Sequence, residues 1–383
     1  MLERRGQIDG RAAPWASPWA SRRPGALRHI ADSEPVVVTA GKVARFLAGL
    51  FLLGLVGFPG AYAAAGSKET ASQHLARGDH AGAATLFRAQ AEAGNAVAQN
   101  NLGVLLLRGQ GVAEDPVEAR RWFERAAAQG LPGAMYNMGM LHLRGYGTPV
   151  DRVVAADWLQ QAAEKGDPEA QFYLGTLYFR GTGPGNNPAL AAHWFEQSAL
   201  QGVVEAKYNL ALLLIEGKGI APDEPRAVSL LESIAGTHGE AELALAKLHL
   251  EHSEDRARAE KALALFRKLA EEGRPEAQAA LGMMYVLASG IDKDEQEGRF
   301  WVSQAARQGY GPAQRQLADL YVGGIGVEKD PLEAAAWYQL AAAQGDEQAR
   351  NHAQGLLAQF GEEDRERSRK RVLELQTTIE ARR

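Results

Sequence analysis

Residues 108–130 read RGQGVAEDPVEARRWFERAAAQG, and residues 144–166 read RGYGTPVDRVVAADWLQQAAEKG. The two stretches keep Gly, Asp, Trp and an Ala-Ala pair at the same places. An anchoring alanine recurs with this pattern at intervals of 36 residues, with one interval of 35. Its positions are Ala98, Ala134, Ala170, Ala206, Ala241, Ala277, Ala313 and Ala349. Self-similarity at one fixed period predicts a solenoid built from copies of a single structural unit.

The spacing within one repeat predicts two helices. Residues 98–108 carry alanine and leucine at helical spacing, so they form the first helix. Gly109 and Gly111 follow it, where a helix ends most easily if the backbone can take a positive φ. Asp115 is placed to cap the second helix, and Pro116 fits its first turn, where a missing N–H is harmless.

Small and large residues recur at fixed positions in each repeat, and this pattern indicates a core that neighbouring repeats build together. For the seven anchors from Ala98 to Ala313, the residues 5 and 21 positions later are always Gly or Ala, and the residue 24 positions later is always large. The large residue is tryptophan in five repeats, at Trp122, Trp158, Trp194, Trp301 and Trp337. One helix pair cannot bury both of its faces, so we expect stacked copies to complete each other's core, with each tryptophan in a slot between small residues.

The pattern Ala-x-x-x-Leu-Gly, Gly-x-Gly-Val, Asp and Ala-x-x-Trp-Phe-x-x-Ala-Ala-x-x-Gly resembles the Sel1-like repeat, a relative of the tetratricopeptide repeat. The resemblance implies an all-α, right-handed α/α superhelical solenoid of about seven 36-residue repeats plus capping helices. We expect N-terminal capping helices over residues 64–97, the repeat solenoid over 98–355 and a polar C-terminal helix over 356–383. The charge run of that last helix indicates a solvated face rather than a docking element.

The N-terminal segment has the layout of an exported protein. Residues 36–63 contain two basic side chains, an apolar run of 13 residues from Phe46 to Phe58, and small residues before a predicted cleavage after Ala63. A membrane span needs about 20 apolar residues, so a cleaved signal peptide is the leading interpretation and a retained anchor the alternative. Residues 1–35 lack helical or strand periodicity. We interpret them as a disordered extension and hypothesise a start placed too far upstream.

Composition narrows the chemistry. The chain of 383 residues has a net charge of -5, no cysteine and no clustered basic run, which argues against thiol chemistry, disulfides and nucleic-acid binding. No motif of a hydrolase nucleophile, a metalloprotease or a phosphate-binding loop is present. We therefore expect no catalytic residues, no metal and no cofactor. His249 and His252 lack a third ligand at a supporting spacing and are interpreted as solvated.

Three columns of residues mark a candidate partner-binding groove on the first helices. The arginine column comprises Arg108, Arg144 and Arg180, the aromatic column Tyr136, Phe172 and Tyr208, and the asparagine column Asn101, Asn137 and Asn209. In a superhelix whose first helices line the groove, these side chains could hold a peptide by aromatic contact, backbone hydrogen bonds and pairing with acidic groups. The alternative is that the aromatics and asparagines serve packing and the arginines are solvated.

The resemblance implies a protein–protein interaction role. The leading hypothesis is a periplasmic or secreted scaffold that binds a protein or peptide partner and regulates an envelope process, without enzymatic activity. Contact with the membrane would come only through an uncleaved signal segment. The alternative is a cell-wall or β-lactam hydrolase, as claimed for cysteine-rich Sel1-like relatives. The lack of cysteine in this chain argues against carrying that activity over.

Overall fold

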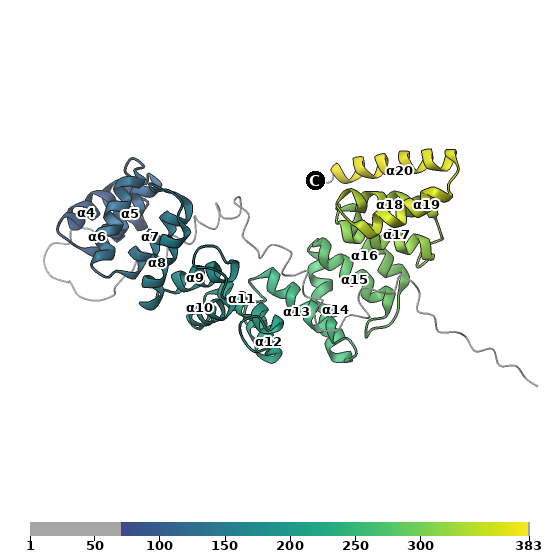
Figure 1. The fold of residues 1–383 in the computed structure, drawn as a ribbon, viewed down its shortest axis with the longest axis horizontal. Coiled ribbons are helices and arrows are strands. Elements are labelled where there is room, and N and C mark those ends of the chain that lie inside the picture. The colour runs from purple at the N-terminus through teal and green to yellow at the C-terminus, as the bar shows by residue number, and fades with distance from the viewer. Residues whose placement is uncertain (1–69, 382–383) are drawn as a thin grey trace, which may run out of the picture. The chain divides into compact units, whose positions relative to one another are not determined.

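The computed structural model describes residues 70–381, which form eighteen α-helices and no strand (Figure 1). The all-α solenoid class is therefore confirmed. The signal peptide over 36–63 and the extension over 1–35 lie outside the described residues. The described part divides into two compact units, residues 70–230 and 231–381, termed the N-terminal unit and the C-terminal unit. The division falls at the one interval of 35 residues in the repeat pattern.

Each unit is a succession of antiparallel helices in chain order. The N-terminal unit contains α3 (Ala71–Ala76), α4 (His80–Glu92), α5 (Ala96–Arg108), α6 (Pro116–Ala128), α7 (Pro132–Arg144), α8 (Arg152–Glu164), α9 (Pro168–Arg180), α10 (Pro188–Leu200), α11 (Val204–Glu216) and most of α12 (Glu224–Glu232). The C-terminal unit contains α13 (Gly239–Glu251), α14 (Arg256–Glu271), α15 (Pro275–Leu287), α16 (Glu295–Arg307), α17 (Gly311–Gly323), α18 (Pro331–Ala343), α19 (Glu347–Gln359) and α20 (Glu362–Glu380). In the repeats that begin with α5, α7, α9, α13, α15 and α17, the first helix packs against the second.

The turn between the two helices of a repeat is built as the sequence predicts. Gly109 ends α5 with φ 62°, and Gly111 has φ 71°. Asp115 caps α6 by accepting a hydrogen bond from the backbone N–H of Glu118. The second glycine has a further role, because a Cβ atom on Gly111 would lie 2.2 Å from the backbone of His80 in the preceding helix pair. This glycine lets the loop of one repeat touch the helix start of the previous repeat.

The deepest core position is the residue after the tryptophan. Phe123 and Phe195 are almost fully buried, whereas Trp158 and Trp194 are only half-buried. Gly103 allows this packing, since a Cβ atom there would meet the Phe123 ring at 2.7 Å. The slot between small residues, which the sequence predicted for the tryptophan, is therefore occupied by the next residue along the chain. Buried tryptophans occur at Trp122 and Trp337, whose indole N–H groups donate to Glu118 and Glu333 at 3.1 and 2.9 Å.

A buried glutamine bracket ties successive helices together and was not predicted. Gln99 on α5 donates to the carbonyl of Ala91 on α4 at 3.1 Å and accepts from Gln129, at the end of α6, at 2.8 Å. The same pair of bonds recurs at Gln171 with Gln201, at Gln278 with Gln308 and at Gln314 with Gln344. Because each buried amide is satisfied at both ends, the bracket fixes three helices at once.

The repeat that begins with α13 lacks the Gly-x-Gly loop, yet it also forms two helices. Helix α13 ends at Glu251, and α14 begins at Arg256, so the connection is shorter than in the other repeats. In place of the glutamine bracket, Lys268 donates to the buried carboxylate of Glu242 at 2.7 Å.

The C-terminal helix is a docked element, which corrects the expectation of a solvated face. Helix α20 packs against α18, as Figure 1 shows at the end of the chain. Leu375 and Ile379 are buried in the same apolar cluster as Trp337. Arg371 donates to both carboxylate oxygens of Glu333, at 2.6 and 3.0 Å. Polar groups and a thin apolar stripe together hold the helix in place.

Candidate partner-binding surface

The arginine column lies at the C-terminal ends of three successive first helices. Arg108 ends α5, Arg144 ends α7 and Arg180 ends α9, each directly before the glycine that caps its helix. Arg108 and Arg144 are half-buried, and Arg180 is exposed. Each of the three takes part in an interaction within the chain, and Arg180 is the one that is also exposed to solvent.

Two of the arginines line one cavity between successive repeats. The cavity has a volume of about 240 Å³. Its wall, termed the arginine cavity here, is formed by Leu107, Arg108, Glu114, Asn137, Met140, Leu141, Arg144 and Tyr146. Met140 and Leu141 are buried and form an apolar floor, whereas Tyr146 is 47% exposed and stands at the rim. The structure thus brings together Arg108, Asn137 and Arg144 from the predicted site, and it leaves Arg180 outside.

The electrostatics of the arginine cavity are those of a partly dehydrated cationic site. Burial lowers the pKa of Arg108, because the charged guanidinium loses contact with water. Arg144 interacts with the hydroxyl of Tyr173 on α9, whose pKa is raised by burial and lowered to a smaller extent by this arginine. Arg144 forms no ion pair with any carboxylate in the described residues 70–381.

The aromatic column does not form a continuous open surface. Tyr136 is half-buried and lies with its ring centroid 5.9 Å from that of Tyr173, across the repeat boundary. Phe172 lies 6.0 Å from Phe195 of the second helix in its own repeat, and Tyr208 is only 9% exposed. Phe172 and Tyr208 therefore contribute to packing between helices, and Tyr136 interacts electrostatically with Arg144 of the arginine column.

The asparagine column is directed at the protein itself. Asn137 donates a 2.8 Å hydrogen bond to the side-chain carbonyl of Asn100 on the preceding first helix. Asn101 is buried and accepts a long bond of 3.5 Å from the same Asn100, and Asn209 is half-buried. Asn137 therefore pairs with Asn100, which directly precedes the column residue Asn101 in the sequence. The arrangement gives repeats one and two a buried polar contact that the spacing of the column did not reveal.

A group of carboxyls lies at the opposite ends of these first helices. Burial raises the pKa of Glu169, near the start of α9, to about 7, and the neighbouring carboxylates of Glu205 and Asp167 add to the shift. Burial also raises the pKa of Tyr136, which lies near Glu169 on one side and Arg144 on the other. The first helices of the N-terminal unit therefore carry basic groups at one edge and acidic groups at the other.

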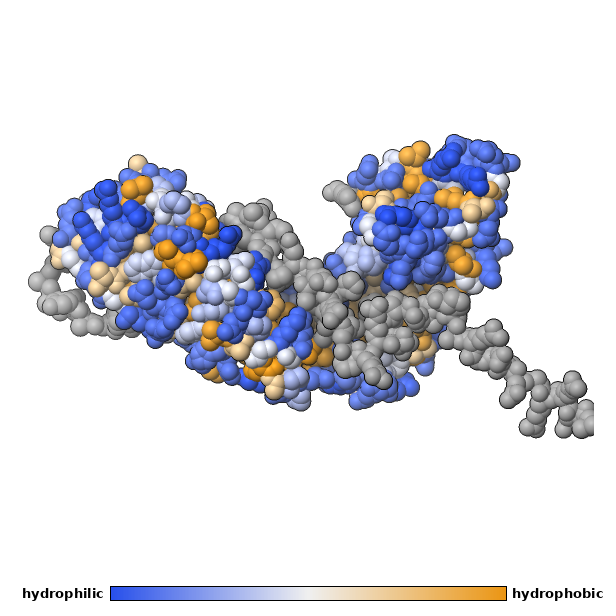
Figure 2. Space-filling model, in the orientation of Figure 1, coloured by the Kyte–Doolittle hydropathy of each residue, from blue (hydrophilic) through white to orange (hydrophobic). Residues whose placement is uncertain are grey.

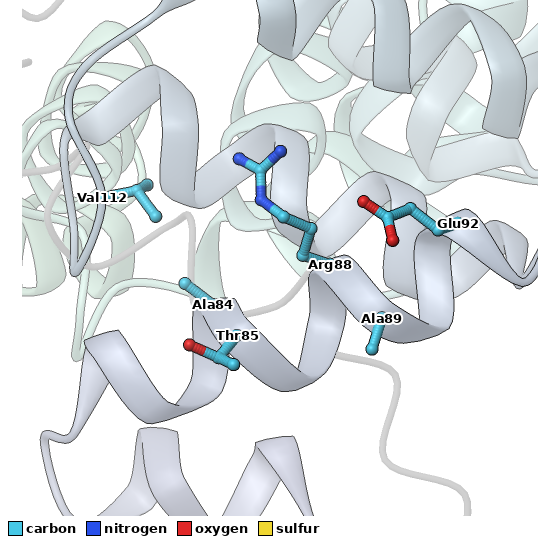
Figure 3. A pocket seen from close by; sticks show the side chains of 6 residues that line it. All are labelled: Ala84, Thr85, Arg88, Ala89, Glu92 and Val112. Atoms are coloured by element: carbon cyan, nitrogen blue, oxygen red, sulfur yellow. The ribbon is translucent and has the colours of Figure 1, made fainter.

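A second cavity, of about 260 Å³, lies on α4 and is a weaker candidate for a binding site. Figure 3 shows Arg88 and Glu92 projecting from α4 beside Thr85, with Val112 across from them. Arg88 donates to Glu118 at 2.7 Å, and Thr85 donates to the carbonyl of Ala81. Since Arg88 and Thr85 are engaged in structural contacts, we regard the arginine cavity as the stronger candidate.

Neither a metal site nor a membrane span is found in residues 70–381. The described side chains contain no cluster of three or more His, Cys, Asp or Glu that could hold a metal. His249 is buried, not solvated as expected, and His252 is half-buried. None of the described helices combines the length and apolar character needed to cross a membrane. On the face shown in Figure 2, both units are largely hydrophilic, with apolar residues in small patches.

Comparison with known families identifies the class of protein. The Sel1 repeat family matches seven segments, at residues 96–131, 132–167, 168–203, 204–235, 239–273, 275–310 and 311–346. These segments cover more than half of the sequence, so the chain belongs to the Sel1 repeat family. Repeats of this class are typical protein–protein interaction scaffolds and are generally non-catalytic. No curated protein sequence matches the chain.

Solved structures with similar folds include other Sel1 repeat proteins. A Sel1 repeat protein from Oxalobacter formigenes is 26% identical, with a TM-score of 0.51, over 80% of this chain and 99% of that one. A protective antigen of uropathogenic Escherichia coli is 25% identical, with a TM-score of 0.42, over 78% of this chain and 80% of that one. The first comparison supports the stacked helix-pair fold described above.

Proposed function

We propose that this protein is a periplasmic or secreted scaffold that binds a partner protein or peptide on the surface of its first helices and so regulates an envelope process. The main support is the arginine cavity, which Arg108 and Arg144 from successive repeats line together with the apolar residues Met140 and Leu141. The membership in an interaction-repeat family and the signal-like segment at 36–63 point in the same direction. Export remains a proposal that rests on the sequence alone.

The geometry favours binding over catalysis. The arginine cavity offers cationic donors, a phenol at its rim and an apolar floor, which are groups that recognise a ligand. A nucleophile paired with a base would be needed for the hydrolase alternative, and no arrangement in residues 70–381 specifically supports one. Scaffolding is therefore the function that these residues support best.

Site-specific photo-crosslinking in cells tests the proposal. A photoreactive amino acid replaces Tyr146, at the rim of the arginine cavity, or Leu200, which is 76% exposed on the second helix α10. We expect discrete protein adducts from position 146 in the periplasmic or secreted fraction and few from position 200. Adducts only from position 200 would move the binding face to the second helices. The absence of adducts from both positions, or a protein found in the cytoplasm, would contradict the proposal.

A further inference from the structure

The tryptophan on the second helix of a repeat is covered by a carboxylate in three of the five repeats that have this tryptophan. In each of the three, the indole N–H donates to the glutamate four residues earlier, at 2.8 to 3.1 Å. The pairs are Trp122 with Glu118, Trp301 with Glu297 and Trp337 with Glu333. In the first and the last pair, an arginine from another helix also donates to the glutamate, namely Arg88 of α4 and Arg371 of α20. Charged side chains therefore cover the outer edge of these tryptophans.

The second helices α8 and α10 lack this cover. Their tryptophans, Trp158 and Trp194, are half-buried, and the residues four positions earlier are Val154 and Leu190. Within residues 70–381, no group accepts a hydrogen bond from either indole N–H, and neither N–H is buried. Leu190 is 38% exposed, and both tryptophans pack against the same apolar cluster. These four residues, termed the tryptophan face here, are an apolar surface with two unused hydrogen-bond donors.

The C-terminal helix shows how the chain itself covers this repeat position. Helix α20 lies across two successive second helices, mainly on α18 and to a smaller extent on α16. Leu375 and Ile379 belong to the apolar cluster that contains Trp337, which is only 2% exposed. Arg371, four residues before Leu375, donates to Glu333 beside the indole N–H. An amphipathic helix with a contact stripe of three residues at four-residue spacing therefore covers the tryptophan.

We infer that the tryptophan face is a docking surface for an amphipathic α-helix of a partner protein, with apolar residues at all three positions of such a stripe. Helices α8 and α10 correspond to α16 and α18, because each pair consists of second helices of successive repeats. Leu190 stands at the repeat position of Glu333, so the partner helix needs an apolar residue where α20 has Arg371. This surface is separate from the first-helix surface of the proposed function, and neither proposal depends on the other.

The charge beside the tryptophan face favours a basic partner helix. Asp157 is exposed next to Trp158 and forms no ion pair within residues 70–381, and the whole chain has a net charge of -5. Complementary charges across an interface speed association and select the partner. The exposed His193 stands at the repeat position of Ala336, which is buried on α18. The partner helix therefore needs a small residue where it crosses α10.

Two synthetic peptides of residues 361–381 test the inference with the full chain. One has the sequence of α20, and the other carries Arg371→Leu, which makes the stripe apolar throughout. The chain variant Leu190→Glu introduces the residue type that three other repeats have at this position, so we expect it to fold. Leu200→Glu is the matched control on the same helix. Leu200 is 76% exposed, and its repeat equivalent, Ala343, is exposed although α20 covers α18. Circular dichroism verifies that both variants are folded.

Fluorescence anisotropy should show an exchange of preference between the two peptides. The Arg371→Leu peptide should bind the wild type and the Leu200→Glu variant alike. It should bind the Leu190→Glu variant about tenfold more weakly, because the new carboxylate would be covered by an apolar side chain. The unchanged α20 peptide should bind the Leu190→Glu variant about tenfold more tightly than the wild type, since its arginine gains a carboxylate partner.

Three results would overturn the inference. If Leu190→Glu leaves binding of the Arg371→Leu peptide unchanged, the peptide binds elsewhere, for example by displacing α20 from α18. If neither peptide binds saturably, the tryptophan face does not accept a helix. If sedimentation velocity shows a dimer for the wild type and a monomer for Leu190→Glu, a second copy of the chain occupies the face. Each of these results leaves the first-helix scaffold proposal standing.

Discussion

The side-chain amide of Asn137 donates a 2.8 Å hydrogen bond to the side-chain carbonyl of Asn100, and both residues are buried. The bond joins α7 to α5, the first helices of successive repeats. A buried amide is stable only when its polar atoms are paired, so each asparagine fixes the position of the other. The contact also supports the wall of the arginine cavity, because Asn137 is one of its lining residues.

We predict that Asn137→Ala destabilises the protein by about 1–3 kcal/mol, because the buried carbonyl of Asn100 loses its donor. The control is Asn209→Ala at the same repeat position, where the side chain is half-buried and should cost less than about 1 kcal/mol. Urea denaturation followed by circular dichroism measures both. Equal losses would show that the Asn100 contact does not stabilise the stack.

The second glycine of the turn allows a second prediction. Gly147 has φ 64°, and a Cβ atom there would lie 2.6 Å from the carbonyl oxygen of Pro116 in the preceding repeat. Gly147→Ala should lower the free energy of unfolding by about 1–3 kcal/mol through backbone strain and the displaced contact. Gly133→Ala is the control, since that helical glycine has open space around it and should be neutral or stabilising by up to about 1 kcal/mol. Thermal unfolding separates the two variants, and a similar drop in both would contradict the close-approach explanation.

The repeat architecture could be predicted because the period and the special residues point to the same turns. Gly109 ends one helix and Asp115 caps the start of the next. Both effects depend only on residues a few positions away in the sequence, so they can be predicted from it. The glutamine bracket was equally visible as a recurring residue at Gln99 and Gln129. It was missed because its meaning lies in a contact between helices and not in helical spacing.

The candidate site was harder to predict, because the direction of a side chain on a packed helix depends on how the neighbouring helix crosses it. Tyr136, Phe172 and Tyr208 occupy the same repeat position, yet Tyr208 is buried whereas the other two are half-buried. Asn137 pairs with Asn100, not with Asn101, one position away from the column. A column in the sequence establishes that residues share a position, and only the structure shows which of them, such as Arg108 and Arg144, share a cavity.

The raised pKa of Glu169 predicts a dependence of stability on pH. A carboxyl with a folded-state pKa of about 7 and an unfolded value near 4.5 binds its proton more tightly when folded. The wild type should therefore lose stability relative to Glu169→Gln as the pH rises from about 4.5 to 7. Above pH 7 the variant should be more stable by about 1–3 kcal/mol, and below pH 4 the two should agree.

Chemical denaturation at several pH values measures this difference. Glu205→Gln removes one of the neighbouring charges and should give part of the same gain, since burial is the larger cause of the shift. A stability difference between wild type and Glu169→Gln that stays constant from pH 4 to 8 would show that folding does not raise the pKa of Glu169.

The docking of α20 gives the last prediction. Leu375 is 7% exposed in the cluster that contains Trp337, whereas Leu373, two residues earlier, is 63% exposed. Leu375→Ala should cost about 2–3 kcal/mol of stability and release the helix, because it leaves a cavity against α18. Leu373→Ala should cost less than about 0.5 kcal/mol. Limited trypsin digestion measures release through the rate of cleavage after Lys370, which lies on the docked helix. Faster cleavage in the Leu375 variant alone is expected, because the exposed Leu373 does not hold the helix against α18. Equal cleavage rates in both variants would mean that the Arg371–Glu333 pair holds α20 without help from its apolar stripe.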